Sequence, residues 1–232
     1  MDLRTAVVWE SLRDLLGSRE QCDVLDIGGG TGGFAAGVAE LGHRVLVVEP
    51  NPDALAAFHR RADERGVADR VRGQQGELST LLDVAEPDSV DVVLCHGVLE
   101  WAGDPAVALD TIARVLRPGG MLSLLVAQQH AAVLARALAG HFHQALAVLD
   151  GDAEPERGSR FTLAELGELL PAAGFTLEKV HGIRVFADHV PGTLLDSEPH
   201  AAEALVELER AVAERPEFHS LATQLHVLAR LG

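Results

Sequence analysis

The sequence predicts an α/β fold built on a doubly wound, mostly parallel sheet of seven strands, with a helical insertion over its active face. Short apolar runs alternate with helical patterns along the first half of the chain, as expected for strands joined by crossover helices. One of these runs leads directly into a glycine-rich turn and a further helical pattern. A chain of 232 residues is also long enough to bury one substantial core.

The strand candidates are short runs rich in branched apolar residues, as strands buried on both faces of a sheet require. The strongest are residues 22–27, 44–49, 90–95 and 121–126, and weaker ones lie at 70–75, 175–185 and 221–231. Helical patterns with apolar residues three and four apart occupy residues 31–41, 52–65 and 104–116. Pro52 and Pro105 fall where a first helical turn tolerates proline, and the run RPGG at 117–120 ends the third helix.

Beyond residue 127 the pattern predicts a long alanine-rich helix over 128–149 and a mobile polar loop over 150–159. Thr162 and Glu165 form a capping box that opens a further helix, and a final helix is expected at 199–214. We therefore expect one domain over 1–232. Its cofactor-binding half spans about 1–127, its substrate-side helical insertion about 128–174, and its C-terminal strands and helix 175–232.

Composition limits the classes of function. Apolar residues make up 47% of the chain and the formal net charge is −16, which indicates a folded protein without general attraction to nucleic acid. A basic patch for RNA would have to come from arginines, because Lys179 is the only lysine. No apolar stretch would span a bilayer and no signal peptide is visible, so we expect a cytoplasmic protein without a membrane partner. Cys22 and Cys95 lack metal-ligand spacing, so we expect buried reduced thiols and no metal.

The run DIGGGTG at 26–32 joins a strand to a helix and predicts a ligand site at the helix N-terminus. Glycine at 28, 29 and 30 lets a ligand approach the backbone, and Asp26 lies at the strand end. NAD enzymes use a similar turn, so this motif by itself does not identify the ligand.

Three further elements follow the next strands in order, at the sheet edge where ligands of such folds bind. Glu49 can accept hydrogen bonds from ribose hydroxyls, and polar residues near 75 can seat an adenine edge. Together with the turn, they favour S-adenosylmethionine over NAD, although Glu49 and His96 could instead only cap their strands. These cofactor candidates are Asp26, Gly28, Gly29, Gly30, Glu49, Pro50, Gln75, Gly76, Glu77, Cys95 and His96.

Several longer motifs resemble one known family. They are GVLEW at 97–101, DP at 104–105, LRPGG at 116–120, GIRVFAD at 182–188 and EALVELE at 203–209. The chain resembles, over nearly its whole length, the bacterial tRNA 5-carboxymethoxyuridine methyltransferases, which methylate the carboxylate of a modified wobble uridine. The resemblance implies a class I S-adenosylmethionine-dependent methyltransferase.

The resemblance also implies roles for individual residues. By position, Arg4 corresponds to the family's arginine for the methionine carboxylate of the cofactor, and Glu49 to its ribose acid. Gly28 and Gly29 correspond to contacts with the methionine portion, Gln75 and Gly76 to the adenine side, and His96 to the histidine after the strand.

The chain departs from the family in three places. Residues 151–157 are acidic where the family has a lysine-rich run, and Ala127 and Gln128 replace an aromatic residue and an asparagine. Family members also carry a lid segment ahead of the arginine that matches Arg4, so we expect a trimmed start or a differently built lid.

Methyl transfer from a sulfonium is an in-line displacement that depends on positioning and desolvation. A carboxylate acceptor is already ionised and needs no general base, but it needs a cation to orient it. Arg184 could provide a bidentate clamp, although a structural ion pair with Asp188 or Glu178 is an equal alternative. His130 or His96 could act as a base for a hydroxyl or amine acceptor.

Three functions therefore remain open. The first is a carboxyl methyltransferase acting on tRNA, and the second is an O- or N-methyltransferase acting on a small molecule, which the acidic composition favours. The third is a protein that binds S-adenosylmethionine without catalysis, since a fold does not determine a function.

Overall fold

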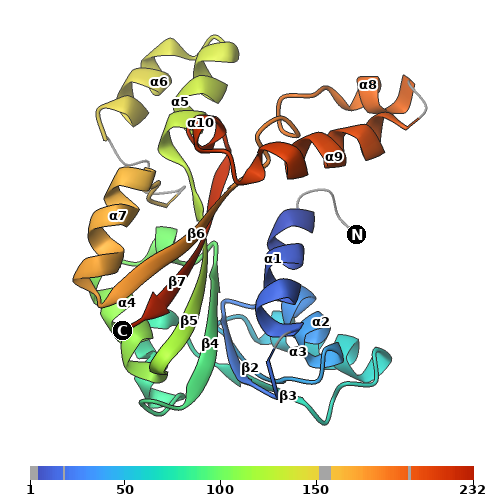
Figure 1. Cartoon of the computed structure of the whole chain (residues 1–232), viewed down its shortest axis with the longest axis vertical. Helices are drawn as coiled ribbons and strands as arrows, with labels where there is room; N and C mark the ends of the chain where they lie inside the picture. The colour runs from blue at the N-terminus through green and yellow to red at the C-terminus, as the bar shows by residue number, and fades with distance from the viewer. Residues whose placement is uncertain (1–4, 18, 152–157, 198–199) are drawn as a thin grey trace.

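The computed structural model describes residues 5–17, 19–151, 158–197 and 200–232. It contains a seven-stranded sheet with the strand order β3-β2-β1-β4-β5-β7-β6 (Figure 1). Strands β1 to β5 pair in parallel, whereas β7 is antiparallel to both β5 and β6. The predicted fold class is confirmed. The strands are β1 Asp23–Ile27, β2 Arg44–Glu49, β3 Val71–Gln75, β4 Val90–His96, β5 Leu116–Ala127, β6 Phe175–Ile183 and β7 Gln224–Leu231.

Helices cover both faces of the sheet, on opposite sides in Figure 1. One core contains the buried side chains of α1 Ala6–Gly17, α2 Gly33–Glu40 and α3 Pro52–Glu64. The other contains those of α4 Pro105–Val115 and α7 Leu163–Ala172, with the short helices η1 Leu78–Asp83 and η2 Leu99–Trp101. Each face therefore has its own apolar core, as in other doubly wound sheets.

Local sequence signals explain where these helices begin. Asn51 accepts a hydrogen bond from the N–H of Asp53 ahead of Pro52, and Asp104 caps α4 in the same way. Thr162 and Glu165 form the predicted capping box at α7.

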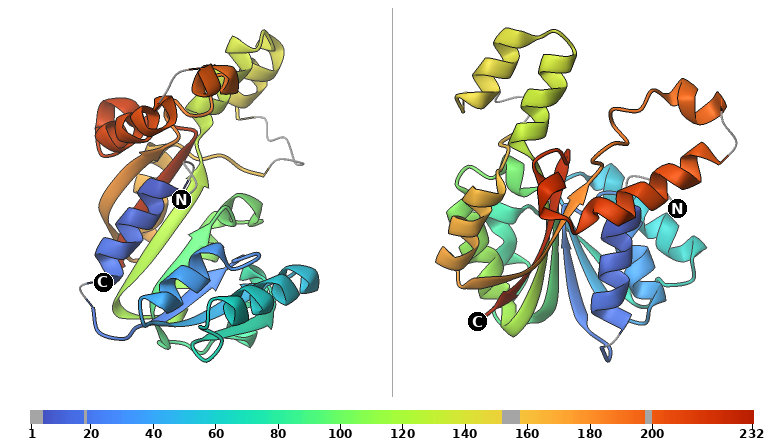
Figure 2. Two further views of the ribbon diagram at one scale, coloured as in Figure 1. Left: turned by 90° about the vertical axis from the view of Figure 1, so that its right-hand side faces the viewer. Right: turned by 45° about the horizontal axis from the view of Figure 1, so that its top comes forward.

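The structure corrects the prediction of one long helix over 128–149. Gly140, with φ +78°, separates α5 Gln129–Leu138 from α6 Phe142–Leu149, which pack as a hairpin. Figure 2 shows this hairpin standing beyond the carboxyl edge of the parallel strands. Helices α8 Gly192–Ser197, α9 Ala201–Ala213 and α10 Pro216–His219 lie between β6 and β7 in the chain.

The start of β5 also differs from the prediction. Strand β5 begins at Leu116, because a register shift against β4 accommodates the residues that were predicted to form only a turn. The predicted loop at 150–159 contains residues 152–157, which lie outside the described residues. No helix of the described part of the chain is long and apolar enough to cross a bilayer.

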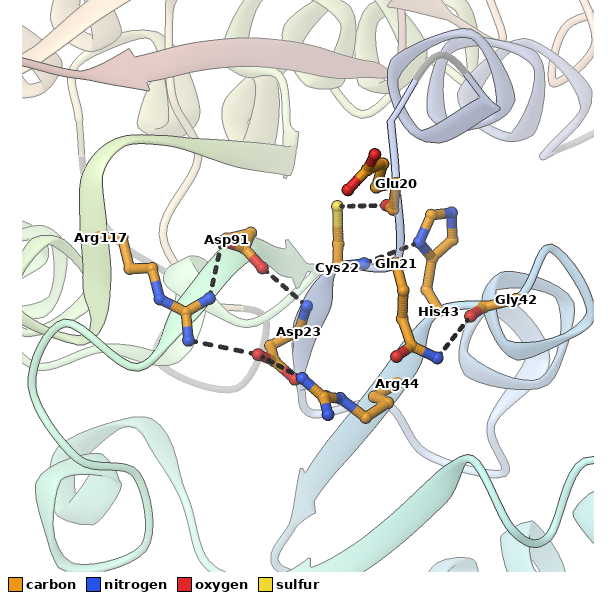
Figure 3. A network of polar contacts seen from close by, with 9 residues as sticks. All are labelled: Glu20, Gln21, Cys22, Asp23, Gly42, His43, Arg44, Asp91 and Arg117. Atoms are coloured by element: carbon orange, nitrogen blue, oxygen red, sulfur yellow. Dashed lines mark hydrogen bonds and ion pairs between the residues drawn. The ribbon is translucent and has the colours of Figure 1, made fainter.

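The amino edge of the sheet is held together by an ion-pair network (Figure 3). Asp23 on β1 pairs with Arg44 on β2 at 2.7 Å and with Arg117 on β5 at 3.2 Å. Arg117 also pairs with Asp91 on β4 at 2.7 Å, and the backbone N–H of Asp23 donates to Asp91. Burial raises the pKa of Asp91, but the Asp23 N–H and the Arg117 guanidinium together hold it below its usual value. Four strands are thus joined at the edge opposite the candidate site.

Candidate functional site

The glycine-rich turn leaves the carboxyl end of β1 in a left-handed conformation. Gly28 and Gly30 have φ values of +66° and +55°, which side chains rarely adopt. A Cβ atom on Gly28 would lie 2.5 Å from the Cγ2 atom of Val98. The turn therefore requires glycine at 28 for both backbone conformation and space, and it leaves an open surface for a ligand.

Glu49, at the end of β2, is a buried carboxylate that accepts hydrogen bonds from two turns. Its Oε2 atom accepts the N–H of Gly30 at 3.0 Å, and its Oε1 atom accepts the N–H of Asn51 at 3.0 Å. A carboxylate has about four lone-pair sites, so further acceptor capacity remains for ligand hydroxyls. Glu49 does more than cap its own strand, because it links the glycine turn to the loop after β2.

Asp26 lies beneath the turn and is nearly inaccessible to solvent, with 3% of its surface exposed. A Cβ on Gly29 would lie 2.7 Å from its Oδ2 atom, so only glycine fits above this carboxyl group. Burial, together with the negative charge of Glu49, raises the pKa of Asp26 to about 7. Near neutral pH this carboxyl group can therefore gain or lose a proton when a charged ligand arrives.

A cavity of about 550 Å³ opens beside the turn, a volume typical of small-molecule sites. Among the predicted residues, Gly28, Glu49, Pro50 and Glu77 line it. The wall also contains residues that were not predicted as site residues, among them Ser79, Val98 and Trp101. Trp101 is 62% exposed. Its position shortly after the strand at 90–95, at the edge where ligands of such folds bind, was the signal by which the sequence could have placed it here.

The remaining adenine-side candidates support the loops that form this cavity. The side-chain amide of Gln75 donates to the carbonyl of Pro50 at 3.1 Å, and the N–H of Gly76 donates to the carbonyl of Glu49 at 3.3 Å. Cys95 is completely buried, and burial raises the pKa of its thiol to about 12, so it packs as a core residue. Arg4 lies outside the described residues.

His96 ends β4 at the same edge of the sheet. Its Nε2 atom lies 2.9 Å from the Ser123 hydroxyl, and its ring meets Phe34 edge-on with the ring centres 4.9 Å apart. Burial lowers the pKa of His96 to about 4, so the ring is neutral. Its buried Nδ1 atom has no hydrogen-bond partner among the described residues.

The catalytic candidates Arg184 and His130 lie near a second cavity, of about 290 Å³, between α5 and the segment after β6. Arg184 forms an ion pair with Asp188, which lines this cavity, and its Nε atom is buried without a partner among the described residues. His130 is exposed on α5, with its Nδ1 atom 3.4 Å from the Gln128 amide. Neither residue lines either of the two cavities.

These features fit the predicted cofactor. The larger cavity can receive a nucleoside, Glu49 can accept ribose hydroxyls, and the glycine turn leaves room for the methionine portion. The described residues contain no cluster of three side chains that could hold a metal ion.

Known proteins with similar sequences are methyltransferases, in agreement with the predicted cofactor. A family model described as a methyltransferase domain matches residues 25–124. The tRNA 5-carboxymethoxyuridine methyltransferase of Escherichia coli (strain K12) is 31% identical over 98% of this chain and 88% of its own length. A ubiquinone biosynthesis O-methyltransferase of Xanthomonas euvesicatoria is also 31% identical, over 73% of this chain and 67% of its own.

Solved structures show the same fold at lower sequence identity. An S-adenosylmethionine-dependent methyltransferase from Mesorhizobium loti has a TM-score of 0.66 at 20% identity, covering 99% of this chain and 100% of that one. A Burkholderia thailandensis 1,6-didemethyltoxoflavin-N1-methyltransferase, solved with S-adenosylhomocysteine, has a TM-score of 0.61 at 22% identity, covering 98% and 78%. At identities of 20% and 22%, this similarity shows that the fold is shared.

Proposed function

Because this chain belongs to the family of S-adenosylmethionine-dependent methyltransferases that contains bacterial tRNA 5-carboxymethoxyuridine methyltransferase, we propose that it methylates the carboxylate of a modified wobble uridine in tRNA. One observation carries this proposal. The similarity to the Escherichia coli enzyme covers 98% of the chain and so includes the elements beyond residue 124, where we expect the acceptor to bind. We further propose that residues 1–232 act as one cytoplasmic methyltransferase domain.

The site residues suit such a reaction. S-Adenosylmethionine supplies an electrophilic methyl group, so the protein has to hold the donor, align the acceptor and exclude water. Glu49 and the turn at 28–30 would hold the cofactor at the larger cavity. A carboxylate acceptor is already ionised, and therefore no side chain has to remove a proton from it.

Arg184 would orient the acceptor carboxylate. Its guanidinium has five N–H donors, and the ion pair with Asp188 uses only part of this capacity. The buried Nε–H without a partner among the described residues is a donor that an anionic acceptor could satisfy. This observation supports the clamp, while the Asp188 pair is the structural alternative foreseen from the sequence.

A second candidate is methylation of a small acid, alcohol or amine. The net charge of −16 favours it, because binding to RNA depends on clustered positive charge. The two candidates differ in the size of the acceptor, and an alcohol or amine acceptor also differs in the chemical bond that the methyl group forms.

Both differences can be measured in one experiment. The protein is incubated with methyl-tritiated S-adenosylmethionine and either tRNA that carries unmethylated carboxymethoxyuridine or a protein-free metabolite extract. We expect label in the tRNA that mild alkali releases as methanol, because a methyl ester hydrolyses and an N- or C-methyl group does not. Label only in the metabolite fraction, or alkali-stable label in tRNA, would contradict the proposal. Glu49→Gln serves as the cofactor-binding control.

A further inference from the structure

A chain of hydrogen-bonding side chains crosses four neighbouring strands of the sheet. It begins at His96 on β4, whose Nε2 atom lies 2.9 Å from the Ser123 hydroxyl on β5. That hydroxyl lies 2.8 Å from Nε2 of His226 on β7. Nδ1 of His226 lies 3.2 Å from Nδ1 of His181 on β6, and Nε2 of His181 lies 3.3 Å from Oε1 of Glu214. We call these five residues the relay.

The interior of the relay is shielded from water and the outer end is not. Ser123 and His226 are completely buried and His181 is 4% exposed, whereas the Glu214 side chain is 65% exposed. Burial lowers the pKa values of His181 and His226, as it does that of His96. All three imidazoles are therefore neutral, and each has one N–H donor and one acceptor nitrogen.

This constraint gives the relay a single direction. The Glu214 carboxylate only accepts hydrogen bonds, so Nε2 of His181 carries the proton and its Nδ1 accepts. Nδ1 of His226 must then donate to His181, and Nε2 of His226 must accept from the Ser123 hydroxyl.

The same reasoning reaches the site. Since the Ser123 hydroxyl donates to His226, its oxygen accepts from Nε2–H of His96. The remaining nitrogen of His96, Nδ1, then carries a lone pair. It is the buried atom that has no hydrogen-bond partner among the described residues.

We propose that Glu214 is a positioning residue that acts through His181, His226 and Ser123 to hold His96 as its Nε2–H tautomer, so that Nδ1 accepts a hydrogen bond from the ammonium group of bound S-adenosylmethionine. The N–H donors of the cofactor are its ammonium and its adenine amino group. The ammonium is the nearer one, because Ile27 and Cys95 are partners in register and the residues that follow them, Gly28 of the methionine-side turn and His96, are therefore neighbours at the sheet edge. If the hydrogen bonds of the relay ran in the opposite direction, Nδ1 of His96 would carry a proton and could not accept a hydrogen bond from the ammonium group. The inference requires cofactor binding and does not depend on the identity of the methyl acceptor.

Other charged groups act on the outer end of the relay. Nζ of Lys179 lies 3.8 Å from Oε1 of Glu214, and the positive potential of Lys179 and His219 also reaches His181. Because both basic groups oppose protonation of His181, they favour the neutral relay without supplying an acceptor.

Replacing the terminal acceptor by a donor tests the direction. In Glu214→Lys, an ammonium would donate to Nε2 of His181, and every bond as far as His96 would reverse. Long-range ¹H–¹⁵N spectra of histidine-labelled protein report which ring nitrogen bears the proton. We expect His96 to be the Nε2–H tautomer in the parent protein and the Nδ1–H tautomer in this variant.

The matched control is Glu217→Lys, an equal charge change at an exposed residue of α10 that is outside the relay. It should leave the His96 tautomer unchanged. Ser123→Ala removes the bridging hydroxyl, so adding Glu214→Lys to it should have no further effect on His96. Thermal melts of each variant verify that the fold is intact.

Calorimetry with S-adenosylmethionine tests the contact itself. We expect Glu214→Lys to weaken binding roughly tenfold, the effect of one unmade hydrogen bond to a charged group, and Glu217→Lys to leave it unchanged. An Nδ1–H tautomer in the parent protein, or an unchanged tautomer in Glu214→Lys, would overturn the relay. A reversed tautomer with parental affinity would overturn the contact with the cofactor.

Discussion

The carboxylate of Glu49 accepts the backbone N–H of Gly30 at 3.0 Å, so the acid at the end of one strand fixes the turn that follows another. Cofactor binding should therefore depend on Glu49 both directly and through the turn. We expect Glu49→Ala to weaken S-adenosylmethionine binding by about 1.5–3 kcal/mol, the loss of a charged hydrogen-bond acceptor. Calorimetry measures the change, and Glu40→Ala, an exposed acid on α2, is the control. Parental affinity in Glu49→Ala would exclude the ribose role.

Asp26 should couple cofactor binding to proton release. Its pKa in the folded protein is raised from 3.8 to about 7, so the free protein keeps this proton up to near-neutral pH. S-Adenosylmethionine brings a net positive charge that favours the ionised carboxyl group. We expect binding near pH 6 to release protons and binding at pH 8 to release none, as measured by calorimetry in buffers of different ionisation enthalpy. Asp26→Asn should abolish the release; if it persists there, another group is responsible.

The raised pKa of Asp26 also makes the free energy of unfolding depend on pH. Between about pH 4 and pH 7 the unfolded chain has lost this proton and the folded chain retains it. Because the folded state then binds more protons, the contribution of Asp26 to the free energy of unfolding falls as pH rises through this window. We expect Asp26→Asn to raise the melting temperature of the cofactor-free protein more at pH 8 than at pH 5. An equal shift at both values would show that Asp26 is not the titrating group.

Gly28→Ala should separate backbone strain from steric conflict. Gly28 has φ +66° and a Cβ there would meet Val98, whereas Gly66 has φ +67° and open space around its Cβ position. We expect Gly66→Ala to lower the free energy of unfolding by about 1 kcal/mol, because of backbone strain alone. Gly28→Ala should show the same strain and lose an additional 1–3 kcal/mol, roughly, because the new methyl group overpacks against Val98. Val98→Ala in the Gly28→Ala background should recover part of the second loss only. Denaturant unfolding measures all of these, and equal losses at Gly28 and Gly66 would argue against the Val98 conflict.

Arg184→Lys should affect methyl transfer more than cofactor binding. A lysine keeps the charge but cannot form the planar two-pronged contact with a carboxylate. We expect an unchanged Kd for S-adenosylmethionine and a kcat lower by roughly ten- to a hundredfold, equivalent to about 1.4–2.7 kcal/mol. Asp188→Asn is the matched control, because it weakens the ion pair and leaves the guanidinium in place. A parental rate in Arg184→Lys with the true acceptor would assign Arg184 to structure.

The strands and the cofactor edge could be predicted from the sequence because they depend on local patterns. Buried strands require continuous apolar runs, and Gly28 and Glu49 follow such runs directly. Gly140 was overlooked because the apolar spacing of an alanine-rich helix continues across it, although a left-handed glycine ends the helix.

The relay could not be predicted in this way. Ser123 and His226 are more than a hundred residues apart and meet only because β7 inserts antiparallel between β5 and β6. Arg184 illustrates a different limit: the sequence offered two acidic partners, and the left-handed backbone at Arg184, with φ +59°, accompanies the pair with Asp188. The pairing of Ser123 with His226 follows from tertiary geometry, which residue spacing does not encode.

The position of β7 also has a consequence for the order of assembly. Strand β6 is synthesised before β7 yet pairs in the sheet with β7, so its hydrogen-bonding edge has no strand to join until β7 has been made. Strands β1 to β5 can pair earlier, since they are neighbours in the sheet and all five are synthesised before β6 and β7. Insertion of β7 between β5 and β6 is therefore a late, long-range event, and it exposes an apolar strand edge while it is pending. A slow refolding phase, and a tendency to aggregate during it, would originate at this edge.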